Sequence, residues 1–185
     1  MKNFLTFAFI TGLLLPFQTF ALEGPSANVS APALISLTNK ERNGDHLALL
    51  SESELLAKAA QLKANDMANR GYFSHVTPEG KMPWSFMDQV GYHYSQAGEN
   101  LAVNFFDSEK VAEAWMNSPT HRANILKSGF TEIGIGVSNG VFKGKSTIFV
   151  AEFFGTPAAP IKSVPKSKIK RAKNSLIARK NTVAY

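Results

Sequence analysis

Cysteine is absent from all 185 residues of the chain. Its absence excludes disulfide bonds, thiol nucleophiles and thiolate metal ligands, so the fold must be stabilised by its hydrophobic core. Acidic residues are absent from residues 161–185, which carry eight of the 20 lysines and arginines. Residues 22–160 contain 11 basic and 14 acidic residues. The formal net charge of +6 therefore comes from the C-terminal segment and not from the rest of the chain.

Long hydrophobic runs are absent except at the N-terminus. Met1-Lys2 gives a short positive start, and Phe4–Phe20 is apolar with little interruption. Thr19–Ala21 has small residues at the two positions that signal peptidase recognises before its cleavage site. These features predict a secretory signal peptide over residues 1–21, cleaved after the last of them. A membrane anchor is the alternative, but Pro16 interrupts a run that is already short for a span of about 20 residues. We therefore expect a secreted protein, extracellular or periplasmic.

The rest of the chain divides into three segments. Residues 22–32 are rich in Pro, Ser, Ala and Asn and predict a linker. Residues 33–156 have the size and apolar content of one globular domain, which we expect to be monomeric. Residues 157–185 predict a flexible basic tail, which either contacts an anionic envelope polymer or is simply solvated. No nucleic-acid recognition motif accompanies the charge, so nucleic acid is not the expected partner.

Helical patterns come first along the domain and strand patterns come last. Ser51 and Glu54 have the spacing of a capping box, and Gly71 supplies a left-handed stop for the helix between them. From Glu132 the apolar period changes to two, and Asn139-Gly140 predicts a hairpin turn before a second strand at 147–154. Helices followed by an antiparallel hairpin indicate an α+β domain. The predicted helices cover residues 33–42, 51–70, 83–90, 108–117 and 120–126. The second of them has an apolar stripe of Leu55, Leu56, Ala59, Ala60, Leu62 and Met67.

Two of the four histidines stand just after large aromatics, at the entrance to a turn. His75 follows Phe73, and His121 follows Trp115 and a proline. Imidazole is the commonest metal ligand and titrates near neutral pH, but a histidine taken alone is more often an ordinary packed or exposed side chain. Glu99 is the third candidate, because a carboxylate among apolar neighbours is costly to bury unless it is paired. Spacing alone does not link these three residues.

Three longer stretches resemble one known family. The sequences RGYFSHVTPEG, AGEN and VAEAWMNSPTHRANILKSGFTEIGIGV are similar to those of the CAP superfamily, which comprises cysteine-rich secretory proteins, antigen 5 and pathogenesis-related proteins. The similarity covers residues 33–155 and is greatest to the cysteine-poor, bacterial secreted branch. It implies an α-β-α sandwich with a three-stranded antiparallel sheet between helical layers. It also implies a cleft that holds two histidines and acidic residues.

The resemblance also implies the members of this cleft. By motif they are His75, Glu99 and His121, which we expect to bind zinc or another divalent cation. Where related proteins carry a further glutamate, this chain offers only Asn117 or Ser118, which weakens the expected metal site. Glu152 shares a strand face with Ile148, Val150 and Phe154, so it either reaches the cleft or is exposed on the strand. The full set expected to line the cleft is Ser74, Asn100, Trp115, Ser118 and Glu152.

Two functions remain open at this level. The first is a non-enzymatic binding module whose cleft takes a divalent metal, a lipid or another envelope ligand. The alternative is a secreted, peptidase-like hydrolase, because Ser74 adjoins His75 and Ser118 precedes His121 by three residues. No G-x-S-x-G elbow is present, and chain neighbours usually point apart. The sequence therefore favours binding.

Overall fold

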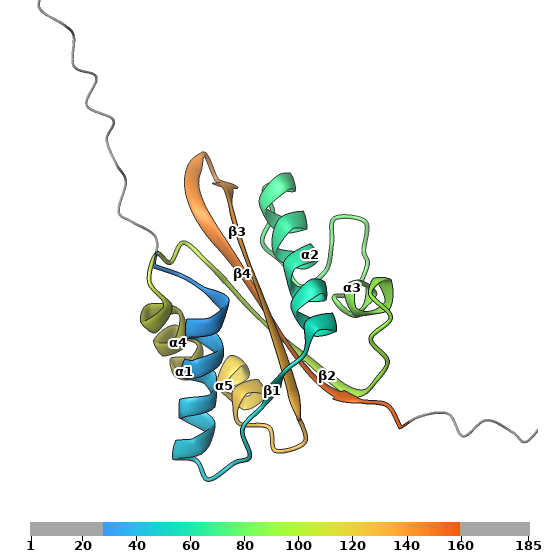
Figure 1. Ribbon diagram of the computed structural model, residues 1–185. Helices are drawn as coiled ribbons and strands as arrows, with labels where there is room; N and C mark the ends of the chain where they lie inside the picture. Colours follow the sequence, from blue (N-terminus) through green and yellow to red (C-terminus); the bar gives the residue numbers. More distant parts are fainter. Residues whose placement is uncertain (1–27, 160–185) are drawn as a thin grey trace, which may run out of the picture.

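The computed structural model describes residues 28–159 of the chain. The predicted signal peptide lies outside these residues, as do most of the predicted linker and nearly all of the basic tail. Five helices and four strands make up the described region (Figure 1), namely α1 (Ala31–Gly44), β1 (Ser51–Glu52), α2 (Glu54–Arg70), α3 (Trp84–Gln89), β2 (Tyr94–Val103), α4 (Ser108–Asn117), α5 (Pro119–Ile125), β3 (Glu132–Phe142) and β4 (Lys145–Pro157).

The sheet has the strand order β1-β3-β4-β2. Strands β3, β4 and β2 are antiparallel, which confirms the α+β class and the three predicted antiparallel strands. A fourth strand was not predicted: β1 is two residues long and pairs with β3 in parallel, Ser51 opposite Glu132. A two-residue segment carries no alternation of apolar and polar side chains, so no sequence pattern could reveal it. Strand β2 forms the other edge of the sheet.

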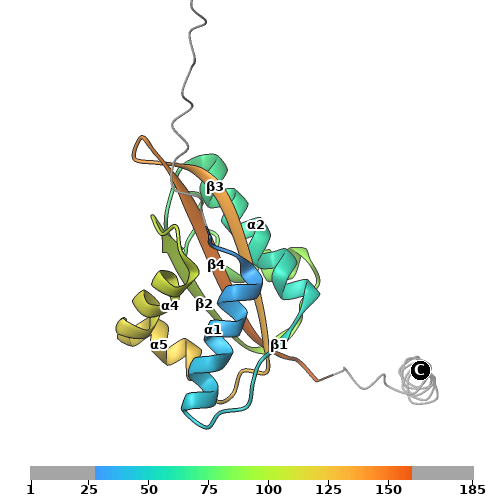
Figure 2. The same cartoon turned by 60° about the vertical axis from the view of Figure 1, so that its left-hand side comes forward.

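Helices cover both faces of the sheet, as the sandwich prediction requires (Figures 1 and 2). The alternation of side chains along β4 divides the core into two clusters. Phe149, Ala151 and Phe153 pack with α2 and α3 on one face. Ile148, Val150 and Phe154 pack with α1, α4 and α5 on the other. Any two adjacent residues of a sheet strand therefore belong to different layers.

Helix α2 lies very close to β3 because glycine occupies the contact positions. A Cβ atom added at Gly134 would lie 2.1 Å from the backbone nitrogen of Ala57, and one at Gly136 would lie 2.3 Å from the carbonyl carbon of Ala60. The buried face of α2 correspondingly carries small side chains, with alanine at 59, 60, 64 and 68. The predicted stripe needs one correction, because Leu55 and Leu62 are exposed at its flanks while Lys63 is buried at its centre.

Two helix starts differ from the prediction. The Ser51 capping box is wrong, because Ser51 lies in β1, where its N–H donates to the carbonyl of Thr131 at 3.0 Å. Helix α2 begins instead at Glu54, after Ser53, whose side chain makes no capping bond. Helix α1 begins at Ala31, inside the predicted linker, because Pro32 suits a first helical turn.

The hairpin turn also differs from the prediction. It lies at Lys143-Gly144, where both φ values are positive, 50° and 78°, as a two-residue turn of this kind requires. Asn139-Gly140 instead lies inside β3. A Cβ atom at Gly140 would lie 2.8 Å from the Cβ of Ala68, so this glycine serves the close approach of α2 and not a turn.

Candidate functional site

The three principal candidates come from three parts of the fold and lie along the free edge of β2. His75 follows α2, Glu99 is on β2 and His121 is on α5. Glu99 pairs across the sheet with Phe153, and Asn100 pairs with Glu152. Since consecutive strand residues face opposite layers, Glu99 faces the α2 layer and Asn100 faces the layer of α1, α4 and α5.

A direct contact joins two of the candidates. Nδ1 of His75 lies 2.5 Å from Oε2 of Glu99. The glutamate side chain is only 2% exposed, whereas that of the histidine is 55% exposed. Burial raises the pKa of Glu99, and the bond to His75 opposes that shift. The same bond raises the pKa of His75, which partial burial opposes. Because Nδ1 is occupied, Nε2 is the ring nitrogen left for a ligand.

The other carboxylate oxygen of Glu99 has no partner among the described residues. Oε1 is buried and makes no hydrogen bond to any residue in the described range 28–159. An unsatisfied buried acceptor costs about 1–3 kcal/mol, and more when it is charged. Such groups in native proteins usually serve a bound water, an ion or a function. The carboxylate that binds His75 therefore has a second oxygen that residues 28–159 leave unsatisfied.

Lys63 was not predicted as a site residue, yet it holds the loop that carries His75. Its side chain is fully buried, and Nζ donates to the carbonyls of Ser74 and His75 at 2.7 and 2.9 Å and to the hydroxyl of Tyr72 at 3.3 Å. These three acceptors match the three N–H groups of an ammonium. Burial lowers the pKa of Lys63, and the charges of Glu99 and Asp66 oppose that shift. The signal in the sequence was a lysine in the middle of an apolar helical stripe.

A second buried network supports α5 from the opposite layer. Nδ2 of Asn100 donates to Oε2 of Glu152 at 2.9 Å and to the carbonyl of His121 at 3.3 Å. Nδ2 of Asn124 donates to Oδ1 of Asn100 at 2.9 Å. The hydroxyl of Thr38 donates to Oε1 of Glu152 at 2.7 Å. Helix α5 is thereby bound to β2 through amide side chains.

Asn100 and Glu152 consequently differ from their expected place. Both are fully buried, so they support the cleft from behind and do not line it. Glu152 is on the predicted strand face but is neither exposed nor open to the cleft, because α1 covers it through Thr38. Burial raises the pKa of Glu152 to about 7, and its bonds from Thr38 and Asn100 oppose that shift.

A mainly apolar groove of about 250 Å³ runs beside His121. Trp115 and Ser118 line it, and Nε1 of Trp115 donates to the carbonyl of Leu101 at 3.0 Å. This bond covers one of the carbonyls on the free edge of β2. The other lining residues are Phe73, Leu101, Ala102, Val103, Phe105 and Ala114. The groove thus has an apolar body with an imidazole at its wall.

The two serines near the histidines are engaged elsewhere. Oγ of Ser74 accepts from the N–H of Val76 at 3.2 Å, within its own turn. Oγ of Ser118 lies 3.3 Å from Oγ1 of Thr120. Neither hydroxyl makes a hydrogen bond to an imidazole within residues 28–159, so the geometry of an activated nucleophile is not present there.

The donor set fits a divalent cation only in part. Within residues 28–159, no group of three or more histidine, cysteine, aspartate or glutamate side chains is arranged to hold a metal ion. Glu99 directs Oε2 to His75, so it stands behind the imidazole as an orienting carboxylate. Burial lowers the pKa of His121, and the charge of His75 lowers it further. What remains for a cation is two imidazoles, two ligands fewer than a closed zinc site needs.

Comparison with known proteins places this fold in a family. The model of the cysteine-rich secretory protein family, CAP, matches residues 35–153. The uncharacterized protein YkwD of Bacillus subtilis is 37% identical over 141 residues, which cover 72% of this chain and 53% of that protein. The uncharacterized membrane protein YlbC of the same organism is 34% identical over 58% of this chain and 31% of its own length. The chain thus spans about half the length of one curated relative and a third of the other.

Solved structures agree with the sequence comparison. An extracellular protein of Bacillus anthracis that contains an SCP domain superposes with a TM-score of 0.58 at 29% identity, over 68% of this chain and 39% of that one. An outer surface protein of Borrelia burgdorferi has a TM-score of 0.59 at 23% identity, over 69% of this chain and 92% of that one, and shares the fold. Among the described residues, no helix is both long enough and apolar enough to span a membrane.

Proposed function

The chain belongs to the CAP family of cysteine-rich secretory proteins, and we propose that it is an exported, non-enzymatic binding module for an amphiphilic ligand. The ligand's polar head lies at His75 and His121, and its apolar part lies in the groove beside Trp115. One observation carries the proposal: the imidazole of His121 lines an apolar groove, and the charge of a second imidazole, His75 bonded to the buried Glu99, acts on it. Such a combination of apolar walls with a few convergent polar groups is typical of ligand pockets.

The arrangement of the histidines supports a polar head at this place. The charge of His75 acts on the pKa of His121, so the two rings lie within electrostatic reach of each other. Phe73 lines the groove and precedes His75 by two residues. A ligand in the groove would therefore contact His121, with His75 within electrostatic reach. An acidic head, a carboxylate or a phosphate, is favoured because Glu99 promotes the charged form of His75.

A hydrolase is the weaker alternative. His75 has the orienting carboxylate that a general base needs, but no hydroxyl of the described residues reaches its ring. Nucleophilic catalysis needs a nucleophile within about 2.6–3.2 Å of the base. Binding requires only the groove and the donors that are present.

A divalent cation fits as an accessory to this cleft. Nε2 of His75 and the ring of His121 would hold it, with Glu99 fixing the tautomer of the first imidazole. A bound cation would offer open coordination positions to the acidic head of a ligand. Because Asn117 and Ser118 supply no carboxylate, we expect zinc alone to bind weakly.

The test is binding of a fluorescent medium-chain fatty acid to the purified protein, with its methyl ester as second probe and with zinc present or absent. We expect saturable binding of the acid that is lost in Val103→Asp, which places a charge in the groove, and weakened in His75→Ala. Val141→Asp is the matched control, because Val141 is an exposed aliphatic residue on β3 outside the groove. Equal binding by all variants would contradict the proposal, and release of fatty acid from the ester would favour the hydrolase.

A further inference from the structure

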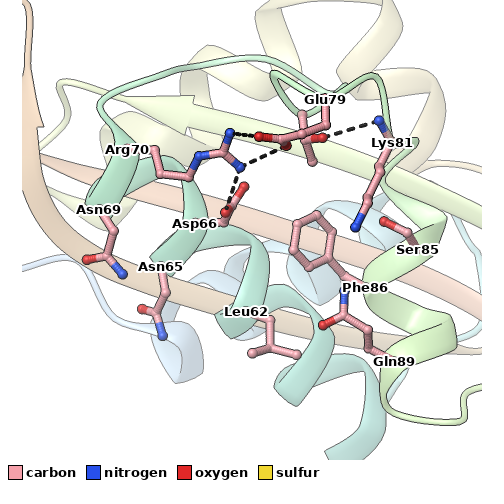
Figure 3. A pocket seen from close by; sticks show the side chains of 11 residues that line it. Leu62, Asn65, Asp66, Asn69, Arg70, Glu79, Lys81, Ser85, Phe86 and Gln89 are labelled. Atoms are coloured by element: carbon pink, nitrogen blue, oxygen red, sulfur yellow. Dashed lines mark hydrogen bonds and ion pairs between the residues drawn. The ribbon is translucent and has the colours of Figure 1, made fainter.

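A second hollow lies on the solvent flank of α2, separate from the groove. It has a volume of about 420 Å³ and is enclosed by α2, the turn at 77–81 and α3. Figure 3 shows the side chains that line it, and His75, Glu99 and His121 are not among them. The residues of α2 that line it include Leu62, Asn65, Asp66 and Asn69, with the spacing i, i+3, i+4 and i+7. Residues with this spacing lie on the same side of a helix.

The bottom of the hollow is apolar. Leu62 is 39% exposed although it lies beside the core. The ring of Phe86 points towards the hollow from α3 (Figure 3). The ammonium of the buried Lys63 lies 5.5 Å from the centroid of the same ring. Phe86 itself is only 6% exposed, so the exposed apolar part of the floor comes mainly from Leu62.

The charges around the hollow cancel. Arg70 donates to both oxygens of Glu79, and it also donates to Asp66 at 3.3 Å. The bond from Arg70 is the main reason why the pKa of Glu79 is lowered to about 2, so this pair stays ionised at neutral pH. Lys81 adds a second positive charge. Two acids and two bases leave no net attraction for a charged ligand.

Neutral amides and the hydroxyls of Thr77 and Ser85 supply the remaining polar groups. The side chains of Asn69 and Gln89 are exposed and make no hydrogen bond to another residue of the described range. Asn65 accepts from Gln61 at 2.8 Å through Oδ1, and its NH₂ group is left for a ligand. Each amide offers donors and acceptors together, and each ionised carboxylate has lone pairs beyond those that Arg70 uses.

We propose that this hollow is a binding site for a neutral saccharide ring. A sugar ring has an apolar C–H face and a rim of hydroxyl groups, each of which both donates and accepts. The face would lie on Leu62 and Phe86, and the hydroxyls would bond to Asn69, Gln89 and the free lone pairs of Glu79. The proposal does not depend on the amphiphile cleft, because the two sites share no lining residue.

The experiment is an NMR titration of the ¹⁵N-labelled protein with two neutral trisaccharides, tri-N-acetylchitotriose and maltotriose. We expect saturable shifts at the backbone amides around the hollow for at least one of them, with a dissociation constant of about 1 mM. The double variant Asn69→Ala and Gln89→Ala should bind about tenfold more weakly. Asn43→Ala, which removes an exposed amide from α1, should bind as the wild type does.

Four outcomes would overturn the proposal. They are no saturable shift with either trisaccharide, shifts confined to other parts of the molecule, unchanged binding by the double variant, and tighter binding of citrate or spermidine at the same amides. The last outcome would mean that the hollow recognises charge. Each single variant, Asn69→Ala and Gln89→Ala, serves if the double variant does not fold, since neither side chain supports the structure.

Discussion

Replacing Glu152 by glutamine should stabilise the protein at pH 8 and remove much of its pH dependence. The carboxyl group is fully buried between β4, β2 and α1, where it accepts one bond from Thr38 and one from Asn100. These two neutral donors do not compensate for the loss of water around a charge. Burial accordingly raises the pKa of Glu152 from 4.5 to about 7.

The sign follows from proton counting. Between pH 4.5 and 7 the folded state keeps a proton that the unfolded state has lost, so stability falls as the pH rises. The contribution is fully present below pH 4.5 and is lost once the pH passes the folded pKa of Glu152. At about 1.4 kcal/mol for each pKa unit, the loss is about 3 kcal/mol. Glutamine is compatible with the site, because its oxygen can accept from Asn100 while its NH₂ group donates to the hydroxyl of Thr38.

Urea unfolding at pH 5 and pH 8, followed by the fluorescence of the buried Trp115, measures this difference. Wild-type protein should lose more free energy of unfolding than Glu152→Gln between the two pH values, by about 3 kcal/mol. Other groups also titrate, since the pKa of His75 is raised and that of His121 is lowered. These groups are present in both proteins, so their contributions cancel when the two pH dependences are compared. Glu113→Gln, at an exposed ion pair, should behave as wild type. An equal pH slope in wild type and Glu152→Gln would refute the reasoning.

Two further substitutions test the support of the site and the fold. Lys63→Met should remove the donor to the carbonyls of Ser74 and His75 and to the hydroxyl of Tyr72, cost about 1–3 kcal/mol of unfolding free energy and move the NMR-measured pKa of His75. A variant with an unchanged imidazole titration would show that Lys63 does not position the loop. Gly136→Ala should cost about 1–3 kcal/mol, because its Cβ would meet the backbone of Ala60 at 2.3 Å. Thermal unfolding measures this cost, and Gly44→Ala is the control, because no atom lies within 4 Å of a Cβ added at Gly44. Equal melting temperatures of the two variants would contradict the close packing of α2 on β3.

The parts of the fold with a clear period were predictable from the sequence. Helix α4 covers Ser108–Asn117, as predicted, and begins after Asp107, whose side chain accepts from the N–H of Lys110 as an N-cap residue does. Gly71 ends α2 with a φ of 65°, as expected for a left-handed stop. The misplaced hairpin turn has a different origin. Asn139-Gly140 has the composition of a turn, but packing against α2 decides its conformation, and this contact is distant in sequence.

The candidate site was only partly accessible to sequence reasoning. A carboxylate at Glu99 among apolar neighbours indicated that it must be paired, and the structure pairs it with His75. The sequence did not show which histidine it meets, because 24 residues separate Glu99 from His75 and the family resemblance implied both histidines. Lys63 and Glu152 could not be assigned, since the burial of each depends on three elements that only the tertiary fold brings together.

The dipeptide Glu99-Asn100 links the candidate site to the register in which β2 pairs with β4. Glu99 binds the loop of His75 from the α2 layer, and Asn100 binds the carbonyl of His121 from the opposite layer. Two adjacent residues of one strand edge therefore hold the imidazole of His75 and the backbone of His121. A slip of one residue would exchange these faces and bring the carboxylate of Glu99 to Glu152, where two acids would share a buried site. The cost of that arrangement selects the observed register, so the same residues that form the site also specify the pairing of the strand that carries it.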